Sequence, residues 1–323
     1  MQFFIQYNLG IDGANWKAST KGTIIHKVME VIAGLKKYEQ DKPKARTLIL
    51  DDDNLGKLKI GKSAFRTEEY VDQLIDDCYN FYTEKCENSY DNKDYKFCIK
   101  WAKEALTFNG GEFDPRNQNI LQPEQFFDIT FDEDWAKYNY NMPDGRELSG
   151  NLSIKGTIDL LTLEDENTIE TIDYKTGQRK NFATGKKKTQ EYLEKDPQLL
   201  LYYYAIKKLY PEYDNVIMTI YFVRDGGPFS MCFDEIDEEY FIQKIKDRFD
   251  EVVSDKTPSC IKYHPAKKSN CFMCRYGREN WPGTNTRICD FVETNLEYLG
   301  MDETIRTCAE DGFDIGYYHA PGS

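Results

Sequence analysis

Two aspartates and a lysine fall on a pair of short apolar segments in the middle of the chain. Asp159 lies in the first segment, and Asp173 and Lys175 lie in the second. The Ile, Leu and Thr residues of these segments and the polar break at 164–167 predict a β-hairpin. Such a hairpin places the two aspartates side by side, and Lys175 shares a strand face with Asp173 because side chains alternate along a strand.

This set of side chains suits the metal-assisted hydrolysis of a phosphodiester. Carboxylate oxygens hold hard cations such as Mg²⁺ or Mn²⁺. A bound cation lowers the pKa of a water ligand and offsets the charge that develops on the phosphate. A lysine can orient that water or stabilise the same charge. The alternative is a solvated hairpin that carries its acids on an outer face, because an Asp-x-Lys tripeptide is common.

A helix is predicted near the start of the chain, where Ile25, Val28, Ile32 and Leu35 repeat at helical spacing. His26 is four residues before Glu30, and this pair shares a face other than the apolar one. A lone helical histidine is more often structural. His26 is nevertheless a candidate metal ligand, because a glycine and an acid lie one turn away on either side.

A second helix begins at Asp196, an N-cap residue followed by a proline at the first helical position. Gln198 and Tyr202 lie one turn apart on it. The stretch between hairpin and helix holds five basic residues with no acid before Glu191. It is either a solvated loop or a loop that grips the phosphate backbone of a substrate. The five are Arg179, Lys180, Lys186, Lys187 and Lys188.

Other segments complete the expected architecture. Residues 36–62 are polar and are expected to form a surface loop or an insertion, and residues 64–108 are expected to be helical. A strand candidate at 126–131 is expected to pair with the segment 152–163 at a sheet edge. Further strands are predicted at 216–223 and 229–233, followed by an amphipathic helix over 236–253.

The C-terminal part of the chain holds a cysteine cluster. Cys271 and Cys274 form a CxxC, the spacing with which a tight turn presents two thiolates to one metal. Cys260 and Cys289 flank it, and His264 is an alternative fourth ligand. Four thiolates would suit Zn²⁺ or an iron–sulfur cluster, whereas buried thiols without a metal are the structural alternative.

Composition limits the class of protein. The net charge of −14 argues against a general nucleic-acid coat, although a local basic groove can coexist with an acidic surface. No signal peptide is visible, and no apolar run approaches the roughly 20 residues of a membrane span. The sequence therefore predicts a soluble, cytoplasmic protein without a membrane partner, in which nine cysteines serve as free thiols and metal ligands.

Five motifs in order carry a resemblance. They are Gly22-xxx-His26, Gly156-x-Ile-Asp159, Asp173-Tyr-Lys175, Gln198-xxx-Tyr202 and the C-terminal CxxC. This order resembles the RecB-type branch of the PD-(D/E)XK nuclease superfamily, as in the AddB-like and CRISPR-associated four-cysteine nucleases. The resemblance covers roughly residues 20–30 and 150–290. It implies an α/β fold with a restriction-endonuclease-like core, a mixed central sheet flanked by helices, and a C-terminal cysteine-rich metal site.

The resemblance also implies roles for single residues. His26, Asp159, Asp173 and the carbonyl of Tyr174 would be the metal ligands, and Lys175 would be the catalytic lysine. Gln198 and Tyr202 would complete the catalytic set by positioning DNA or Lys175. The implied domain organisation is residues 1–35 as the N-terminal part of the core, 36–150 as a helical insertion or subdomain, 151–255 as the nuclease core, and 256–323 as the cysteine-rich segment.

The cysteine pattern departs from that of the iron–sulfur members, which place one cysteine near the N-terminus, ahead of the histidine motif. Here no cysteine precedes Cys78, so either the start is truncated or the ligand is replaced, with Cys260 as the substitute. A 4Fe-4S cluster on Cys260, Cys271, Cys274 and Cys289 is the first expectation. Zinc is the second, and a degenerate cluster that binds nothing is the third.

The expected function is that of a Mg²⁺- or Mn²⁺-dependent deoxyribonuclease, an exonuclease preferring single strands or ends, in DNA recombination, repair or replication. A recombination or replication protein would be its partner. The first alternative is a non-catalytic DNA-binding or assembly subunit with a nuclease-like fold. The second is a metal-stabilised interaction module without nucleic acid, which the −14 charge favours.

Overall fold

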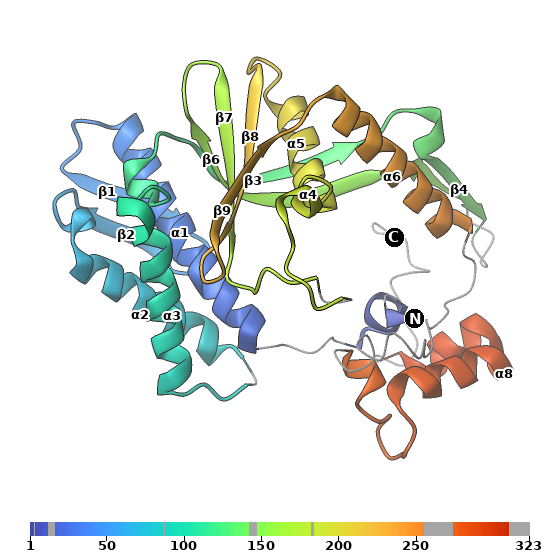
Figure 1. Cartoon of the computed structure of the whole chain (residues 1–323). Helices are drawn as coiled ribbons and strands as arrows, with labels where there is room; N and C mark the ends of the chain where they lie inside the picture. Colours follow the sequence, from blue (N-terminus) through green and yellow to red (C-terminus); the bar gives the residue numbers. More distant parts are fainter. Residues whose placement is uncertain are drawn as a thin grey trace.

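A five-stranded mixed sheet forms the centre of the molecule in the computed structural model (Figure 1). The structure describes residues 1–2, 4–11, 17–86, 88–141, 147–181, 184–254 and 274–309. The strand order is β3-β6-β7-β8-β9; β7 and β8 run parallel, and the other neighbours are antiparallel. The expected α/β fold with a mixed sheet flanked by helices is confirmed. The strands are β3 (Ile120–Thr130), β6 (Ser153–Leu163), β7 (Thr168–Lys175), β8 (Asn215–Phe222) and β9 (Gly227–Cys232).

Three helices cover one face of this sheet: α1 (Lys17–Asp41), α2 (Glu68–Glu84) and α3 (Asn92–Thr107). The apolar stripe of α1 packs with Leu160, Ile172 and Tyr174 from the strands. These side chains share one face because strand residues alternate in direction. The stripe is fully buried, which fixes the rotation of α1 and hence the direction of its polar face.

The opposite face is covered by α5 (Pro197–Leu209) and α6 (Glu235–Ser254), with the short α4 (Gln190–Leu193) beside them. Asp196 caps α5 as predicted, because its side chain accepts a hydrogen bond of 3.1 Å from the amide of Gln198. Leu199 and Ile206 of α5 pack with Met218 of β8. The predicted strands at 216–223 and 229–233 and the helix at 236–253 are confirmed within a few residues.

The predicted hairpin is β6–β7, and its two strands separate where the site begins. Their ladder runs from Leu163 opposite Ile169 to Leu160 opposite Ile172. Before Leu160, β6 pairs with β3 alone. β3 is the edge strand of the sheet, as expected for the strand candidate at 126–131. The amides of β7 beyond Ile172 therefore have no backbone partner on β6.

Two glycines allow close approaches around this point. A Cβ on Gly22 would lie 3.1 Å from Oγ1 of Thr176, so the glycine lets the start of α1 lie against the end of β7. A Cβ on Gly156 would lie 2.5 Å from the ring of Phe127, which is buried in the core. Added volume at such positions forces side chains out of their preferred rotamers.

The expected surface loop at 36–62 is wrong, because this segment forms the hairpin β1 (Thr47–Asp52) and β2 (Gly56–Gly61). Leu48 of β1 is buried against α1, and tertiary packing of this kind overrides a polar composition. The segment 36–150 thus contains helices, as expected, but it also supplies β3 to the central sheet. A second hairpin, β4 (Lys137–Asn141) with β5 (Glu147–Asn151), follows β3.

The N-terminal segment packs with the C-terminal part of the chain. The π-helix η1 (Phe4–Asn8) contacts α8 (Ile288–Cys308), which is kinked at Gly300. Tyr276 donates a hydrogen bond of 2.6 Å to the carbonyl of Ile11 and so links the two ends. None of the helices in the described part of the chain is long and apolar enough to cross a membrane. The remaining short helices are η2 (Ala64–Arg66), η3 (Phe108–Gly110), η4 (Pro115–Asn117), η5 (Asp134–Ala136) and η6 (Arg275–Gly277).

Candidate active site

Asp159 lies at the point where β6 leaves β7, and both of its carboxylate oxygens have partners. Oδ2 accepts a hydrogen bond of 2.9 Å from the backbone amide of Tyr174, one of the amides that β6 leaves unpaired. Oδ1 lies 3.1 Å from Nδ1 of His26. The carboxylate therefore replaces the β6 backbone as the hydrogen-bond partner of the Tyr174 amide. It also contacts the ring of His26 on α1.

His26 faces this carboxylate from the polar side of α1. Burial lowers the pKa of His26, but the hydrogen bond and the charge of Asp159 outweigh that effect and raise the pKa above its ordinary value. The histidine is therefore held in contact with Asp159, one of the two acids predicted as its neighbours in the site. Asp173 adds to the rise in pKa by its charge.

Asp173 and Lys175 form an ion pair on the same face of β7. The Nζ of Lys175 lies 2.9 Å from Oδ1 and 2.7 Å from Oδ2 of Asp173. Asp173 is 1% exposed, and burial raises its pKa to about 6, although the charge of Lys175 opposes the rise. Its Oδ2 accepts no well-aligned hydrogen bond despite the short ionic contact. Both oxygens of Asp173 therefore lie in ionic contact with the Lys175 ammonium.

Gln198 and Tyr202 make a short chain of hydrogen bonds beside these residues. The side-chain amide of Gln198 donates to the Tyr202 hydroxyl at 2.8 Å, and this hydroxyl donates to the carbonyl of Thr157 at 2.8 Å. Tyr202 thus ties α5 to β6 two residues before Asp159. Gln198 lines the same cavity as Lys175, so the structure brings it to the site while Tyr202 stays largely buried.

The donor set fits a hard divalent cation in its chemistry. Two carboxylates, a backbone carbonyl and an imidazole are ligands that Mg²⁺ or Mn²⁺ accepts, and Oδ2 of Asp173 has no hydrogen bond. Among the described residues, no three His, Cys, Asp or Glu side chains converge closely enough to hold a metal ion. In this arrangement Asp159 is bonded to His26, and Asp173 is bonded to Lys175.

A second pair of acids lies beside the first. Glu124 has a left-handed backbone with φ of 47°, between residues of β3 that pair with Ile158 and Leu160. It therefore lies next to Asp159 on the neighbouring strand. Burial raises the pKa of Glu30 to about 7; its hydrogen bond to Glu124 adds to the rise, while Lys27 opposes it. The i, i+4 spacing from His26 signalled the position of Glu30, but no sequence pattern placed Glu124.

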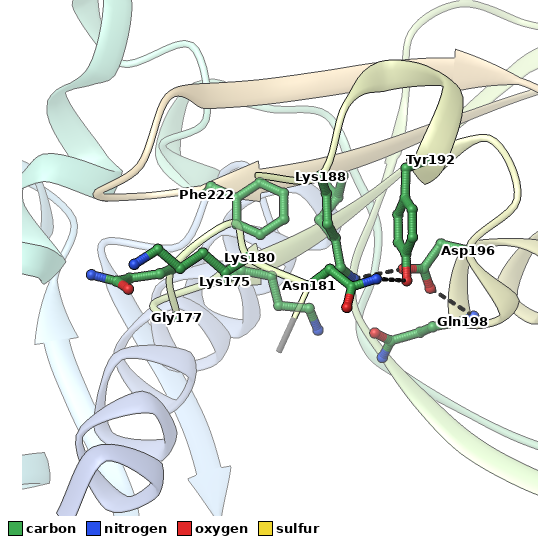
Figure 2. A pocket seen from close by; sticks show the side chains of 11 residues that line it. Lys175, Gly177, Lys180, Asn181, Lys188, Tyr192, Asp196, Gln198 and Phe222 are labelled. Carbon is green, nitrogen blue, oxygen red and sulfur yellow. Dashed lines mark hydrogen bonds and ion pairs between the residues drawn. The ribbon is translucent and has the colours of Figure 1, made fainter. Parts of the chain in front are cut away.

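A cavity of about 380 Å³ opens directly beside Lys175 (Figure 2). Its wall comes from the segment between β7 and α5, and its floor comes from β8. Ile220 and Phe222 were missed because only the parallel register of β7 and β8 brings them to Lys175. Sequence reasoning assigned only Lys175, Lys180, Lys188 and Gln198 of the lining residues to the site. Besides Lys175 the lining residues are Gly177, Gln178, Lys180, Asn181, Lys188, Tyr192, Asp196, Gln198, Ile220 and Phe222.

The basic stretch after Lys175 is only partly free to bind an anion. Lys187 forms an ion pair of 2.7 Å with Asp225, and Lys188 forms one of 2.8 Å with Asp196. The guanidinium of Arg179 lies 4.5 Å from the centre of the Phe229 ring and donates to the carbonyl of Lys188. Lys180 and Lys186 make no ion pair within the described chain; Lys180 lines the cavity, and Lys186 is exposed.

The predicted cysteine site lies partly outside the described residues, which exclude Cys260, His264 and Cys271. Cys274 and Cys289 are half-buried and pack against the same hydrophobic cluster, which includes Tyr276 and Ile288. Within the part of the chain that the structure describes, no group of cysteines capable of holding a metal is present. The predicted cysteine-rich metal site is therefore not seen among these residues.

The raised pKa of Asp173 predicts a pH-dependent effect on stability. A carboxyl whose pKa is raised from 3.8 to about 6 favours the folded state at low pH, and this contribution is lost as the pH rises through 6. Asp173→Asn removes the titration. We expect the free energy of unfolding of the variant, relative to the unsubstituted protein, to increase by about 1–3 kcal/mol between pH 4 and pH 7 in EDTA.

Denaturant unfolding at several pH values measures this difference. Asp94→Asn is the control, because Lys21 and Lys17 hold the pKa of Asp94 at about 2, so its contribution changes only below pH 4. The control difference should stay flat between pH 5 and pH 7. A flat difference for Asp173→Asn as well would contradict the raised pKa.

Comparison with known proteins places this chain in a family. Residues 1–278 match the family model of the PD-(D/E)XK nuclease superfamily. No curated protein and no solved structure gave a match. The match is to the superfamily, so the RecB-type branch stays a prediction. Because the match spans most of the chain and the mixed sheet flanked by helices agrees with it, the chain belongs to the PD-(D/E)XK nuclease superfamily.

Proposed function

We propose that the protein is a Mg²⁺- or Mn²⁺-dependent DNA nuclease that hydrolyses phosphodiester bonds. Membership of a nuclease superfamily supports the reaction class. The observation that carries the proposal is the meeting of Asp159, Asp173 and Lys175 beside a cavity that opens at Lys175. A purely structural ion pair would not need a second, partly buried carboxylate so close, since two like charges destabilise each other.

The cation would be held by Asp159, Asp173, the Tyr174 carbonyl and His26. When bound, it would supply an activated water and offset negative charge on the phosphate. The amide of Tyr174 and the ring of His26 fix the orientation of Asp159, so this carboxylate is already in place before a ligand arrives. Glu30 lies one turn beyond His26, and it would support the metal ligands without binding the cation itself.

Lys175 would act on the substrate once Asp173 turns to a cation. Its side chain is partly exposed and lines the cavity, whereas Asp173 is buried. If Asp173 held a cation, the ammonium of Lys175 would lose its partner while already lining the cavity. There the ammonium can stabilise charge that develops on the phosphate oxygens. Gln198 would hold the other side of the substrate from α5.

The substrate would be a single strand or a DNA end. Lys180 and Lys186 are the cations of the basic stretch that remain without an ion pair in the described chain, so we assign phosphate contacts first to them. Lys187, Lys188 and Arg179 would mainly hold this segment in shape. An exonuclease role in DNA recombination, repair or replication follows the RecB-type pattern of motifs and is part of the proposal.

We also propose that the cysteine segment binds a metal, as an iron–sulfur cluster or as zinc. The half-buried positions of Cys274 and Cys289 in one cluster support a shared site with Cys260 and Cys271. Metal analysis of protein purified without oxygen should find iron with sulfide, or about one zinc per chain. Cys274→Ser should lower that content and the melting temperature together. Protein without either metal, and with unchanged stability after Cys274→Ser, would contradict a metal site.

The nuclease proposal predicts a specific loss of cleavage. End-labelled single- and double-stranded DNA is incubated with Mg²⁺, Mn²⁺ or EDTA. We expect cleavage that needs the metal and that falls by about 10²–10³-fold in Lys175→Ala, because the variant lacks the charge beside the phosphate. The label pattern gives the polarity of cleavage.

Lys155→Ala is the matched control, because Lys155 lies on β6 near the site but forms an exposed ion pair with Asp128. It should cleave like the unsubstituted protein. Equal cleavage by Lys175→Ala and the unsubstituted protein would place the site elsewhere. A folded, metal-supplied protein that binds DNA without cutting it would instead favour the non-catalytic subunit.

A further inference from the structure

The cavity beside Lys175 has an apolar floor that begins one strand away from the reacting groups. In the parallel register of β7 and β8, Ile220 lies opposite Asp173 and Phe222 lies opposite Lys175. Both are nearly buried, at 3% and 4% exposure, and both line the cavity. Tyr192 of α4 forms one wall and is 45% exposed, so its ring is open to a ligand.

Amide side chains line the same space. Gln178, Asn181 and Gln198 all line the cavity, and Figure 2 labels the last two. Asn181 donates a hydrogen bond of 3.1 Å to the hydroxyl of Tyr192 and so supports the orientation of that ring. An amide both donates and accepts hydrogen bonds, which matches the mixed donor and acceptor edge of a nucleobase.

Four charged side chains line the cavity: Lys175, Lys180, Lys188 and Asp196. Asp196 cancels Lys188 through an ion pair of 2.8 Å, and a cavity built for several phosphates would not include an acid. Lys175 and Lys180 remain as the cations at the other side. The ligand that fits is therefore a neutral, flat group joined to a phosphate. The volume of about 380 Å³ lies at the lower end of the range for small-ligand pockets and is too small for a base pair with its backbone.

We propose that this cavity receives one unpaired nucleobase of the substrate strand, next to the phosphate that Lys175 contacts. This inference rests on the proposed nuclease function and gives it a substrate class: nucleic acid with an unstacked nucleotide at the cleavage position. A base inside a duplex cannot reach the cavity without leaving its stack. Stacking on an aromatic ring tolerates any base, so the pocket selects single strands without reading sequence.

An abasic scan tests the pocket. Each nucleotide of a single-stranded oligonucleotide is replaced in turn by an abasic residue, and cleavage at each phosphate is measured with Mg²⁺. We expect one position, at a fixed distance from the cleaved phosphate, where loss of the base slows cleavage about 5- to 100-fold. Tyr192→Ala should reduce that sensitivity, and Tyr192→Phe, which keeps the ring, should retain it.

A second measurement separates the pocket from the nuclease reaction. In EDTA, 2-aminopurine at the same position of the oligonucleotide should be quenched on binding, and quenched less by Tyr192→Ala. Cleavage of single strands with no position sensitive to base removal would overturn the pocket and leave the nuclease standing. Position-specific quenching without any cleavage would retain the pocket and refute the nuclease. An oligonucleotide that is neither bound nor cut would refute both.

Discussion

The carboxylate of Asp159 joins the two elements that carry the site. One oxygen accepts the amide of Tyr174, and the other contacts the ring of His26. The first bond satisfies a buried strand amide at a place where the neighbouring strand has turned away, and an unsatisfied amide there would be costly. The Asp159 carboxylate therefore links β7 to α1 at the point where β6 leaves β7. The close approach that Gly22 allows at Thr176 has the same consequence, because it brings α1 within reach.

Charge balance explains the resting arrangement of the remaining groups. Asp173 is buried, and a buried carboxylate needs a partner or a proton. Lys175 provides the partner, and the raised pKa shows that the balance is incomplete. A divalent cation would stabilise the ionised Asp173 carboxylate more than one ammonium does, because it carries twice the charge. Under the proposed function, a cation held by Asp173 would free the ammonium of Lys175 to act in the cavity that it lines.

The sequence predicted the central part of this arrangement and not its surroundings. The hairpin, the N-cap at Asp196 and the helix with His26 follow from local patterns, so Asp159, Asp173, Lys175 and His26 could be grouped in advance. The aromatic floor of the cavity could not, because Phe222 reaches Lys175 through a parallel strand pairing nearly fifty residues apart in sequence. The sequence could not place Glu124 beside Asp159, because its position depends on the pairing of β3 with β6. The hairpin within 36–62 was not predicted, because its strands are stabilised mainly by packing on α1 rather than by their own composition.

Diffraction from crystals soaked in Mn²⁺, recorded at the manganese absorption edge, tests the metal-coupled release of Lys175 most directly. We predict an anomalous peak bound by the carboxylates of Asp159 and Asp173, with the ammonium of Lys175 moved away from Asp173 toward the cavity. A peak at another group of acids, or an Asp173–Lys175 ion pair that stays intact at Mn²⁺ concentrations supporting DNA cleavage, would contradict this arrangement.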